Sequence, residues 1–264
     1  MKKLVSLLLF LVIPFVHICA QETVNQTDAN GHKQGHWIGK FPTGTVRYEG
    51  TFANDKPVGE WKRFHENGKI NAHLYHALNT DIATAELFDE NGIRYAKGNY
   101  KGTLKDSTWN YYNNQKLVAQ EDYSNGIKNG RSLTFFENGN IVNESKWVNG
   151  LLDGVIRSFY PSGKKKMEVM YKQGKRQGLN LIYYESGQTE IKGQYNNDMP
   201  DEIWTFINEA GKEKYQLKYK AGILLNPEVV DSIQARQFND FDRAKGQLKD
   251  PEKYSQNPDE YMRN

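Results

Sequence analysis

Residues 59–69 read Gly59-Glu60-Trp61-Lys62-Arg63-Phe64-His65-Glu66-Asn67-Gly68-Lys69. The second glycine follows Glu66-Asn67, and glycine and asparagine are the residue types that accept positive φ in a tight turn. A strand that ends in such a turn is one half of a β-hairpin. The segment therefore predicts a hairpin whose tip lies at Gly68.

The same pattern recurs along most of the chain at intervals of 24 residues. The tip glycines are Gly44, Gly68, Gly92, Gly139, Gly163, Gly187 and Gly211, and Gln115 fills the remaining slot after a one-residue deletion. A second glycine series lies nine residues before the tips, at Gly35, Gly59, Gly130, Gly154 and Gly178. There we expect the chain to turn from one hairpin to the next. Eight repeats over residues 30–222 indicate a one-dimensional array in which no unit buries its apolar face alone.

Side-chain alternation predicts the buried face of each hairpin. Counted from the tip, positions +2, +4, +6 and +8 of the first unit are Val46, Tyr48, Gly50 and Phe52, and polar residues separate them. This period of two is typical of a half-buried antiparallel strand. Position +8 is His76 in one unit and aromatic in the others: Phe52, Tyr100, Tyr123, Trp147, Tyr171, Tyr195 and Tyr219.

The strand before each tip supplies further aromatic residues. Trp37, Trp61, Trp109 and Trp204 lie near its start, and Phe64, Phe88, Tyr111, Phe135, Phe159 and Tyr183 lie four places before the tip. We expect these columns to stack across the strands and to hold the sheet together.

Residues 59–69, followed by Tyr75, resemble the MORN-repeat variant of many bacterial proteins, some of which are described as antitoxin-like. The resemblance covers residues 30–222 in eight units. It implies an all-β fold, an elongated and twisted antiparallel sheet of tandem β-hairpins, and a role in binding or scaffolding without catalysis. Ala83-Thr84-Ala85 replaces the expected Gly and Trp of the third unit, and Asp106-Ser107 replaces the Gly of the fourth. A bend or weak point is expected near residues 77–86 and 105–107.

The N-terminus predicts export. Lys2 and Lys3 precede an apolar run from Leu4 to Val16, as in a secretory signal peptide at residues 1–20, with a linker at residues 21–29. Cys19 is the only cysteine, and cleavage after Ala20 would remove it. Lipidation of Cys19, which would tether the chain to a membrane, is the alternative. The expected location is the periplasm or the cell envelope.

The pattern breaks at Ile223. Asn226-Pro227-Glu228 is a helix-start signal, and Val229, Val230, Ile233, Phe238 and Phe241 form an apolar stripe after it. These residues predict a short C-terminal helix within residues 223–248 that either caps the array or docks a partner. Residues 249–264 are expected to form a flexible tail.

Composition excludes several functional classes. The 264 residues are 38% hydrophobic and 12% aromatic, which argues against both a large aliphatic core and disorder. The net charge is +3, or about +1 without the two lysines of the signal peptide, so a dedicated nucleic-acid binder is not expected. The pairs His32 and His36, and His73 and His76, are too few for a structural zinc site without cysteine. With no nucleophile or phosphate-loop motif, we expect no enzyme, metal or cofactor.

One basic cluster is the candidate binding surface. Lys164, Lys165, Lys166, Lys175 and Arg176 flank a hairpin and the following turn, where they would meet an anionic lipid headgroup, an envelope glycan or an acidic protein. The leading hypothesis is an exported bacterial repeat protein that binds or scaffolds another macromolecule, with an unidentified protein as partner.

Three alternatives remain open. The first is a peripheral binder of anionic lipid or envelope glycan. The second, implied by the resemblance, is an antitoxin-like neutraliser of a partner protein. The third is a glycan-acting enzyme, which requires paired carboxylates in a cleft. Exposed end strands also leave dimerisation open.

Overall fold

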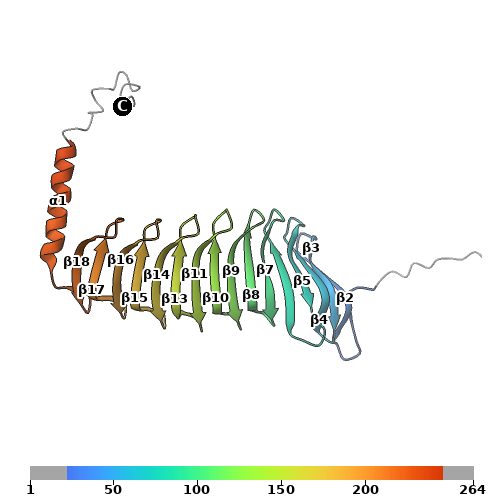
Figure 1. Ribbon diagram of the computed structural model, residues 1–264. Helices are drawn as coiled ribbons and strands as arrows, with labels where there is room; N and C mark the ends of the chain where they lie inside the picture. Colours follow the sequence, from blue (N-terminus) through green and yellow to red (C-terminus); the bar gives the residue numbers. More distant parts are fainter. Residues whose placement is uncertain (1–22, 246–264) are drawn as a thin grey trace, which may run out of the picture.

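The computed structural model describes residues 23–245 of the chain. The predicted signal peptide, Cys19 and the predicted tail at residues 249–264 lie outside the described residues. Within residues 23–245, an elongated antiparallel sheet of side-by-side strands is followed by one helix, and the ribbon twists most visibly at its N-terminal, blue end (Figure 1). The predicted all-β hairpin array is confirmed.

The repeats form eight hairpins, each made of two successive strands. Their strands are β2 (Lys33–Lys40) and β3 (Val46–Ala53), β4 (Lys56–Phe64) and β5 (Ile70–His76), β6 (Ile82–Phe88) and β7 (Arg94–Lys101), β8 (Leu104–Asn113) and β9 (Lys116–Ser124), β10 (Ile127–Phe135) and β11 (Ile141–Val148), β13 (Gly154–Phe159) and β14 (Lys165–Lys172), β15 (Lys175–Tyr183) and β16 (Thr189–Asn196), and β17 (Met199–Ile207) and β18 (Glu213–Lys220). Three two-residue strands complete the sheet: β1 (Gln26–Thr27), β12 (Leu151–Leu152) and β19 (Ile223–Leu224).

Neighbouring strands pair in chain order, so the sheet is a continuous meander. Each hairpin strand pairs antiparallel with the hairpin strand that follows it, from β2 to β18. Strands β12 and β13 both pair with β11, and Asp153 separates them. Every backbone contact of the array is therefore local, as expected for a repeat protein.

The tips lie where the glycine series predicted them. Seven of the eight hairpins close through the same loop, in which the glycine N–H donates to the carbonyl three residues earlier, as Gly68 does to His65 at 2.9 Å. Gly68 has a φ of 82°. The fourth hairpin closes through the two-residue loop Asn114-Gln115, with both residues at positive φ. This shorter loop explains the one-residue deletion in that unit. The closure at Gln115 is confirmed.

The second glycine series does not mark the turns between hairpins, and that prediction is wrong. Gly59 and its equivalents lie inside strands, as part of a β-bulge: Thr51 pairs with Val58 and Gly50 with Trp61, so Gly59 and Glu60 are extra residues. Gly59 has a φ of 64°, which explains the preference for glycine. The connecting turns lie four residues earlier, at two-residue loops such as Asn125-Gly126 and Asn149-Gly150, where both residues have positive φ.

The residue before each bulge fastens the next connecting turn. Its side-chain oxygen accepts the N–H of the first turn residue of the following unit, as Asp153 accepts from Gln173 at 3.2 Å. The same bond joins Gln34 to Asn54, Asp106 to Asn125, Asn129 to Asn149, Gln177 to Asn197 and Asp201 to Ala221. This polar slot was missed in the sequence. Its signal is an Asn, Asp or Gln directly before the glycine of the second series.

The second and third units are joined differently. Val58 occupies the polar slot and has no such oxygen, and the following connection is the longer loop of residues 77–81. Strands β5 and β6 pair without a bulge. At the other predicted weak point, Ser107 takes a φ of 58° in place of glycine and the bulge is retained. The sheet is continuous at both places.

Bulges near the tips correct the predicted side-chain faces. A register shift between Leu87 and Phe88 pairs Phe88 with Arg94, so position +2 shares the face of Phe88 and not that of position +4. Arg94 is position +2 of the third unit, and it binds Glu86 at 3.0 Å on the face opposite to that of position +4. In the shorter fourth hairpin, Tyr112 and not Tyr111 is equivalent to Phe88, because Tyr112 pairs with Leu117 after the register shift.

Both edges of the sheet are closed by an asparagine side chain. The amide of Asn25 accepts from the Ile38 N–H at 2.8 Å and donates to the Ile38 carbonyl at 3.0 Å, beside the short strand β1. The amide of Asn226 accepts from the Lys218 N–H at 2.8 Å and donates to the Gln216 carbonyl at 3.0 Å, beside β19. Each amide replaces a segment of backbone that the edge strand would otherwise offer to another chain.

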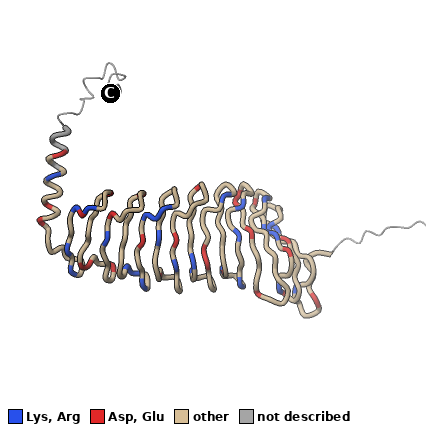
Figure 2. Tube along the Cα trace, viewed as in Figure 1, with Lys and Arg blue, Asp and Glu red and all other residues tan. Residues whose placement is uncertain are grey.

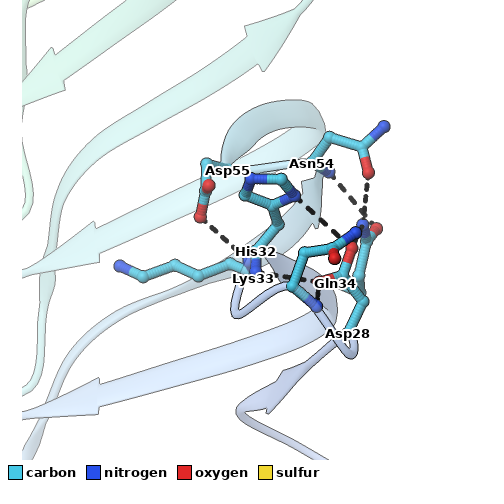
Figure 3. Close-up of polar contacts among 7 residues, drawn as sticks. Asp28, His32, Lys33, Gln34, Asn54 and Asp55 are labelled. Carbon is cyan, nitrogen blue, oxygen red and sulfur yellow. Dashed lines mark hydrogen bonds and ion pairs between the residues drawn. The ribbon is translucent and has the colours of Figure 1, made fainter.

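The N-terminal edge is further tied to the first connecting turn by the polar network of Figure 3. Asp28 accepts from the His32 N–H at 3.0 Å and lies 3.5 Å from the His32 ring, while its second oxygen accepts from Gln34 at 3.4 Å. Gln34 also bonds the side chain of Asn54, and Asp55 accepts from the Lys33 N–H at 2.9 Å. These contacts hold the predicted linker against the sheet from residue 25 onward.

Helix α1 (Pro227–Lys245) leaves the β18 end of the array and extends past the sheet without folding over either face (Figure 1). Val229, Val230 and Ile233 are half-buried, while the other side chains described between residues 227 and 240 are exposed. Asn226 and β19 cover the edge of β18, and among the described helix side chains the half-buried ones lie in the first two turns.

Candidate binding surface

One face of the sheet, here called the ring face, carries the tryptophans Trp61, Trp109 and Trp204. Each lies against a glycine of the preceding strand: a β-carbon at Gly98 would be 2.4 Å from the Trp109 ring, and one at Gly50 would be 2.2 Å from Trp61. Each indole N–H donates to the carbonyl ten residues earlier, as Trp109 does to Asn99 at 2.9 Å. Trp109 is fully buried although the sheet has a single layer.

Position +8 lines up on the ring face, as predicted. Phe52, Tyr100 and Tyr195 meet the tryptophan rings edge to face, with centroid separations of 4.8, 4.9 and 5.0 Å. Edge-to-face pairs at this distance are favourable beyond their buried area. Each +8 residue stands opposite the bulge of a neighbouring strand, as Tyr171 does opposite Gly154. The rings therefore form a column along the array.

Cations lie over the rings at the connecting-turn end. Lys33 lies 4.9 Å from the Phe52 centroid, Lys128 lies 5.0 Å from Trp147, and Arg176 lies 4.0 Å from Tyr195. Lys105 lies within 4.7 to 5.2 Å of Trp109, Tyr111 and Tyr123. The methylene stems cover the rings while the charge stays near solvent, so the ring face is both aromatic and cationic.

A polar network interrupts the ring face at its centre. Glu121 accepts from Lys128 at 2.5 Å and from the Tyr123 hydroxyl at 2.6 Å. Burial raises the pKa of the Glu121 carboxyl, but these two hydrogen bonds outweigh it and leave the pKa below its usual range. Burial and the bond to Glu121 raise the pKa of Tyr123, which therefore remains a hydrogen-bond donor at neutral pH. The network is ionised and satisfied within the sheet.

Four alanines lie on the ring face between Trp61 and Trp109. Ala72, Ala83, Ala85 and Ala96 are buried in β5, β6 and β7, and Ala85 occupies the tryptophan slot of the third unit. Beside them lies a groove of about 620 Å³, here called the alanine hollow. Its apolar lining includes Phe52, Trp61, Leu74, Ala83, Leu87 and Tyr100. The departure seen in the sequence as a weak point is therefore a depression in the ring face.

The opposite face, here called the charged face, carries ladders of paired ions. Glu144 contacts Arg131 at 2.9 Å and Arg157 at 3.6 Å, and Arg157 contacts Glu168 at 2.9 Å. Lys62 lies 3.4 Å from Glu60 and 3.8 Å from Glu49. Acidic and basic residues alternate along the array without gathering at one end (Figure 2). Cross-strand pairing of opposite charges stabilises this face and keeps its net field small.

An apolar stripe, missed in the sequence, follows the connecting turns. It is formed by the first residue after successive turns, Leu104, Ile127, Leu151, Met199 and Ile223, which are between 49% and 68% exposed. Neighbouring members are about 10 Å apart because two strands separate them. At the equivalent position between Leu151 and Met199 the residue is Lys175, which interrupts the apolar series. The 24-residue spacing of these side chains was the available signal.

The structure divides the predicted basic cluster. Lys164, Lys165 and Lys166 lie at the tip of the β13–β14 hairpin, and Lys165 binds Glu168 at 3.2 Å. Lys175 and Arg176 lie at the connecting turn, about 25 Å away along β14. Arg176 is paired with Asp198 at 3.1 Å. The five residues do not form one patch, and binding by either group stays a prediction.

The histidine pairs do not converge on a ligand site. His73 binds Glu60 on the charged face at 2.8 Å, while His76 meets Trp61 on the ring face with centroids 6.2 Å apart. His32 is held by Asp28. Over residues 23–245 no group of three or more His, Cys, Asp or Glu side chains has the arrangement of a metal site. In the same range, no helix combines the length and apolar character of a membrane span.

Comparison with known families finds one match, to four of the hairpins. Four segments match the model of the MORN repeat variant: residues 57–76, 128–149, 152–173 and 176–197. Each segment contains one hairpin of the array, and the four remaining hairpins continue the same meander. No curated protein matches the chain.

Proposed function

We propose, for a chain that carries MORN repeat variants, that the ring face is a binding platform that holds another macromolecule, a protein in the leading hypothesis, outside the cytoplasm. MORN repeats are typically binding modules and not catalysts. The observation that carries the proposal is the difference in side-chain chemistry between the two faces of the sheet. The charged face carries ladders of ion pairs, whereas the ring face combines aromatic rings, the apolar alanine hollow and cations that lie over the rings.

The register of the ring face supports an extended partner. Equivalent side chains recur every two strands, about 10 Å apart, over eight hairpins. Many shallow contacts of this kind add up to affinity without a deep pocket. Charges near the rings favour an acidic partner, because Arg63, Lys105, Lys128 and Arg176 share this face. Lys128 is hydrogen bonded to Glu121 and Arg176 is paired with Asp198, whereas none of the ion pairs found within residues 23–245 includes Arg63 or Lys105.

Site-specific photo-crosslinking in the native cell tests the proposal. A photoreactive phenylalanine analogue at Tyr171, on the ring face, should capture a defined protein in the envelope fraction. The matched control places the analogue at Tyr75, which lies on the charged face and is 59% exposed. Capture of the same protein from both positions, or of none from Tyr171, would reject the platform. Neutralisation of the captured protein's activity would favour the antitoxin-like alternative.

The apolar stripe favours a second candidate function, peripheral binding to an anionic membrane surface. Leu104, Ile127 and Leu151 project from one edge beside the basic residues Lys101 and Lys172. Apolar side chains that enter the interface, with lysines at headgroup level, bind anionic bilayers with strong salt dependence.

Co-sedimentation with phosphatidylglycerol-containing vesicles tests this candidate. We expect Ile127→Asp with Leu151→Asp to abolish binding at the connecting-turn edge. The combined change of Lys164, Lys165 and Lys166 to Glu tests whether the hairpin-tip edge of the sheet contributes to vesicle binding. Absence of salt-sensitive binding by the unmodified protein would remove the membrane candidate.

A further inference from the structure

The alanine hollow differs from the rest of the ring face in shape. At Trp61, Trp109 and Trp204 the ring covers a glycine of the preceding strand and fills the centre of the strand pair. In the third unit Leu74 and Ala85 stand at the paired positions that glycine and tryptophan occupy elsewhere, and the small side chains of Ala72 and Ala83 line the adjoining groove. Tyr95, which is 44% exposed, and Tyr100 stand on one side, with Phe52 and Trp61 on the other. The result is an apolar floor between aromatic walls.

The charges around the hollow have one sign. Arg63 and His76 line it, and no acidic residue does. None of the ion pairs found within residues 23–245 includes Arg63, which is exposed, whereas the nearby acids Glu60 and Glu86 bind cations on the charged face. The guanidinium acts on the hollow, since it contributes to lowering the pKa of His76 and opposes the burial that raises the pKa of Tyr100.

We propose that the alanine hollow receives a bulky apolar side chain of an extended acidic peptide segment, with a carboxylate of that segment bound by Arg63. The proposal rests on the binding function proposed above and names the chemistry of the partner. An apolar side chain fills the floor over Ala72 and Ala83. The carboxylate supplies the charge that the lining lacks, and the guanidinium can bind it through two N–H groups.

A glycan or a lipid headgroup fits the lining less well. A bound sugar needs hydrogen-bonding partners along its edges, and among the polar lining residues Asn71 already interacts with His65. A headgroup would satisfy Arg63 and leave the apolar floor exposed. A peptide with an apolar and an acidic side chain two positions apart satisfies both parts of the hollow, because alternate side chains of an extended chain point to the same side.

Selection from a random dodecapeptide library displayed on phage, against the immobilised full-length protein, tests the proposal. Peptides enriched on the unmodified protein should carry a large apolar residue within a few positions of Asp or Glu. Synthetic versions, measured by fluorescence anisotropy, should bind Arg63→Glu and Ala83→Phe at least tenfold more weakly. Lys192→Glu makes the same charge change on the charged face and should leave binding unchanged.

Arg63→Glu decides the test if Ala83→Phe fails to fold, because Arg63 is exposed and its replacement leaves the core intact. Absence of enriched peptides, or equal binding by Arg63→Glu, overturns the proposal. Anionic vesicles that bind only when Arg63 is present, without any enriched peptide, would assign the hollow to lipid and also overturn it. A partner that still crosslinks from Tyr171 in the Arg63→Glu protein would leave the binding platform standing and reject only the peptide site.

Discussion

At the scale of single residues, the pairing of tryptophan with glycine explains how a one-layer sheet buries an indole ring. Trp109 lies flat against the space that a side chain at Gly98 would occupy, and its N–H is satisfied by the backbone of Asn99. Packing of an aromatic ring over a strand glycine also compensates for the weak strand propensity of glycine. The +6 glycines are thus packing residues, although their backbone is ordinary strand.

Replacement of Gly98 by Ala should destabilise the protein by about 1–3 kcal/mol, because the added carbon overlaps the Trp109 ring and forces it to move. Urea unfolding followed by circular dichroism measures the change. Ser132→Ala, in the same row but without an overlying tryptophan, should have little effect. The cost of Gly98→Ala should shrink in a Trp109→Ala background, and an unchanged cost there would contradict the packing account.

His76 should give the fold a pH dependence. Burial among the ring-face residues lowers the pKa of the His76 imidazole, and Arg63 lowers it further. The unfolded chain therefore takes up a proton at a higher pH than the folded protein does. The contribution of neutral His76 to the free energy of unfolding is therefore complete above a pH of about 6.5 and is lost as the pH falls.

His76→Tyr, which restores the aromatic residue of the other units, should reduce the loss of stability between about pH 7 and pH 5. Denaturation curves at several pH values measure the difference. His73→Tyr on the charged face is the control. Equal pH profiles for the unmodified protein and His76→Tyr would show that the imidazole titrates alike in the folded and unfolded states.

At the scale of elements, the connecting turns are joined to one another by side chains as well as by the backbone. The bond from the Gln173 N–H to Asp153 spans two units, and a second bond runs from the Gly174 N–H to the Leu152 carbonyl at 2.8 Å. These contacts fix the spacing of successive turns. Where Val58 occupies the polar slot, the next connection is the longer loop of residues 77–81.

Asp153→Ala should lower the free energy of unfolding by about 0.5–1.5 kcal/mol, because one hydrogen bond between units is lost. Asp153→Asn should retain most of the stability, since Asn129 makes the equivalent bond in the preceding unit. Chemical denaturation provides both values. Equal losses in the two variants would point to the charge and not to the hydrogen bond.

The asparagine caps should keep the sheet from growing at its edges. In Asn25→Ala with Asn226→Ala, the backbone groups of Ile38, Gln216 and Lys218 lose their side-chain partners. We expect concentration-dependent association of this double variant in analytical ultracentrifugation, since unpaired edge strands pair with other chains. Asn67→Ala, which removes a tip hydrogen bond to Glu90, is the control. A double variant that stays monomeric would assign edge protection to β1 and β19.

At the scale of the whole molecule, the array behaves as a series of equivalent units. Pairing joins only strands that are neighbours in the chain, so the stability is the sum of unit and interface contributions. No second layer covers the sheet within residues 23–245, and both faces remain available. This arrangement provides a long surface with shallow grooves, and the alanine hollow arises where the repeat departs from its own pattern.

Deletion of residues 151–174 should leave a folded protein, because Lys175 then follows Gly150 in the place of Leu151 and the register is kept. The denaturant m value should fall by about one eighth, in proportion to the surface buried by one of eight hairpins. Deletion of residues 151–162 alone removes half a unit and should cause misfolding. Circular dichroism and urea titration test both, and equal behaviour of the two deletions would contradict a modular array.

The sequence alone was sufficient for the tips, the strand alternation and the aromatic columns, because each depends on local chemistry repeated every 24 residues. Gly68 and Phe52 could be assigned from their neighbours and their period. Bulges required the tertiary structure, because an extra residue is visible only when two strands are paired. Gly59 by itself predicts a turn, and strict alternation places position +2 on the wrong face. The division of the Lys164 to Arg176 cluster has the same origin, since β14 extends between its two groups. The alanine hollow likewise exists only because Ala72 of β5 and Ala83 of β6 meet in space between the rings of the neighbouring strands, and that meeting depends on how the strands pair.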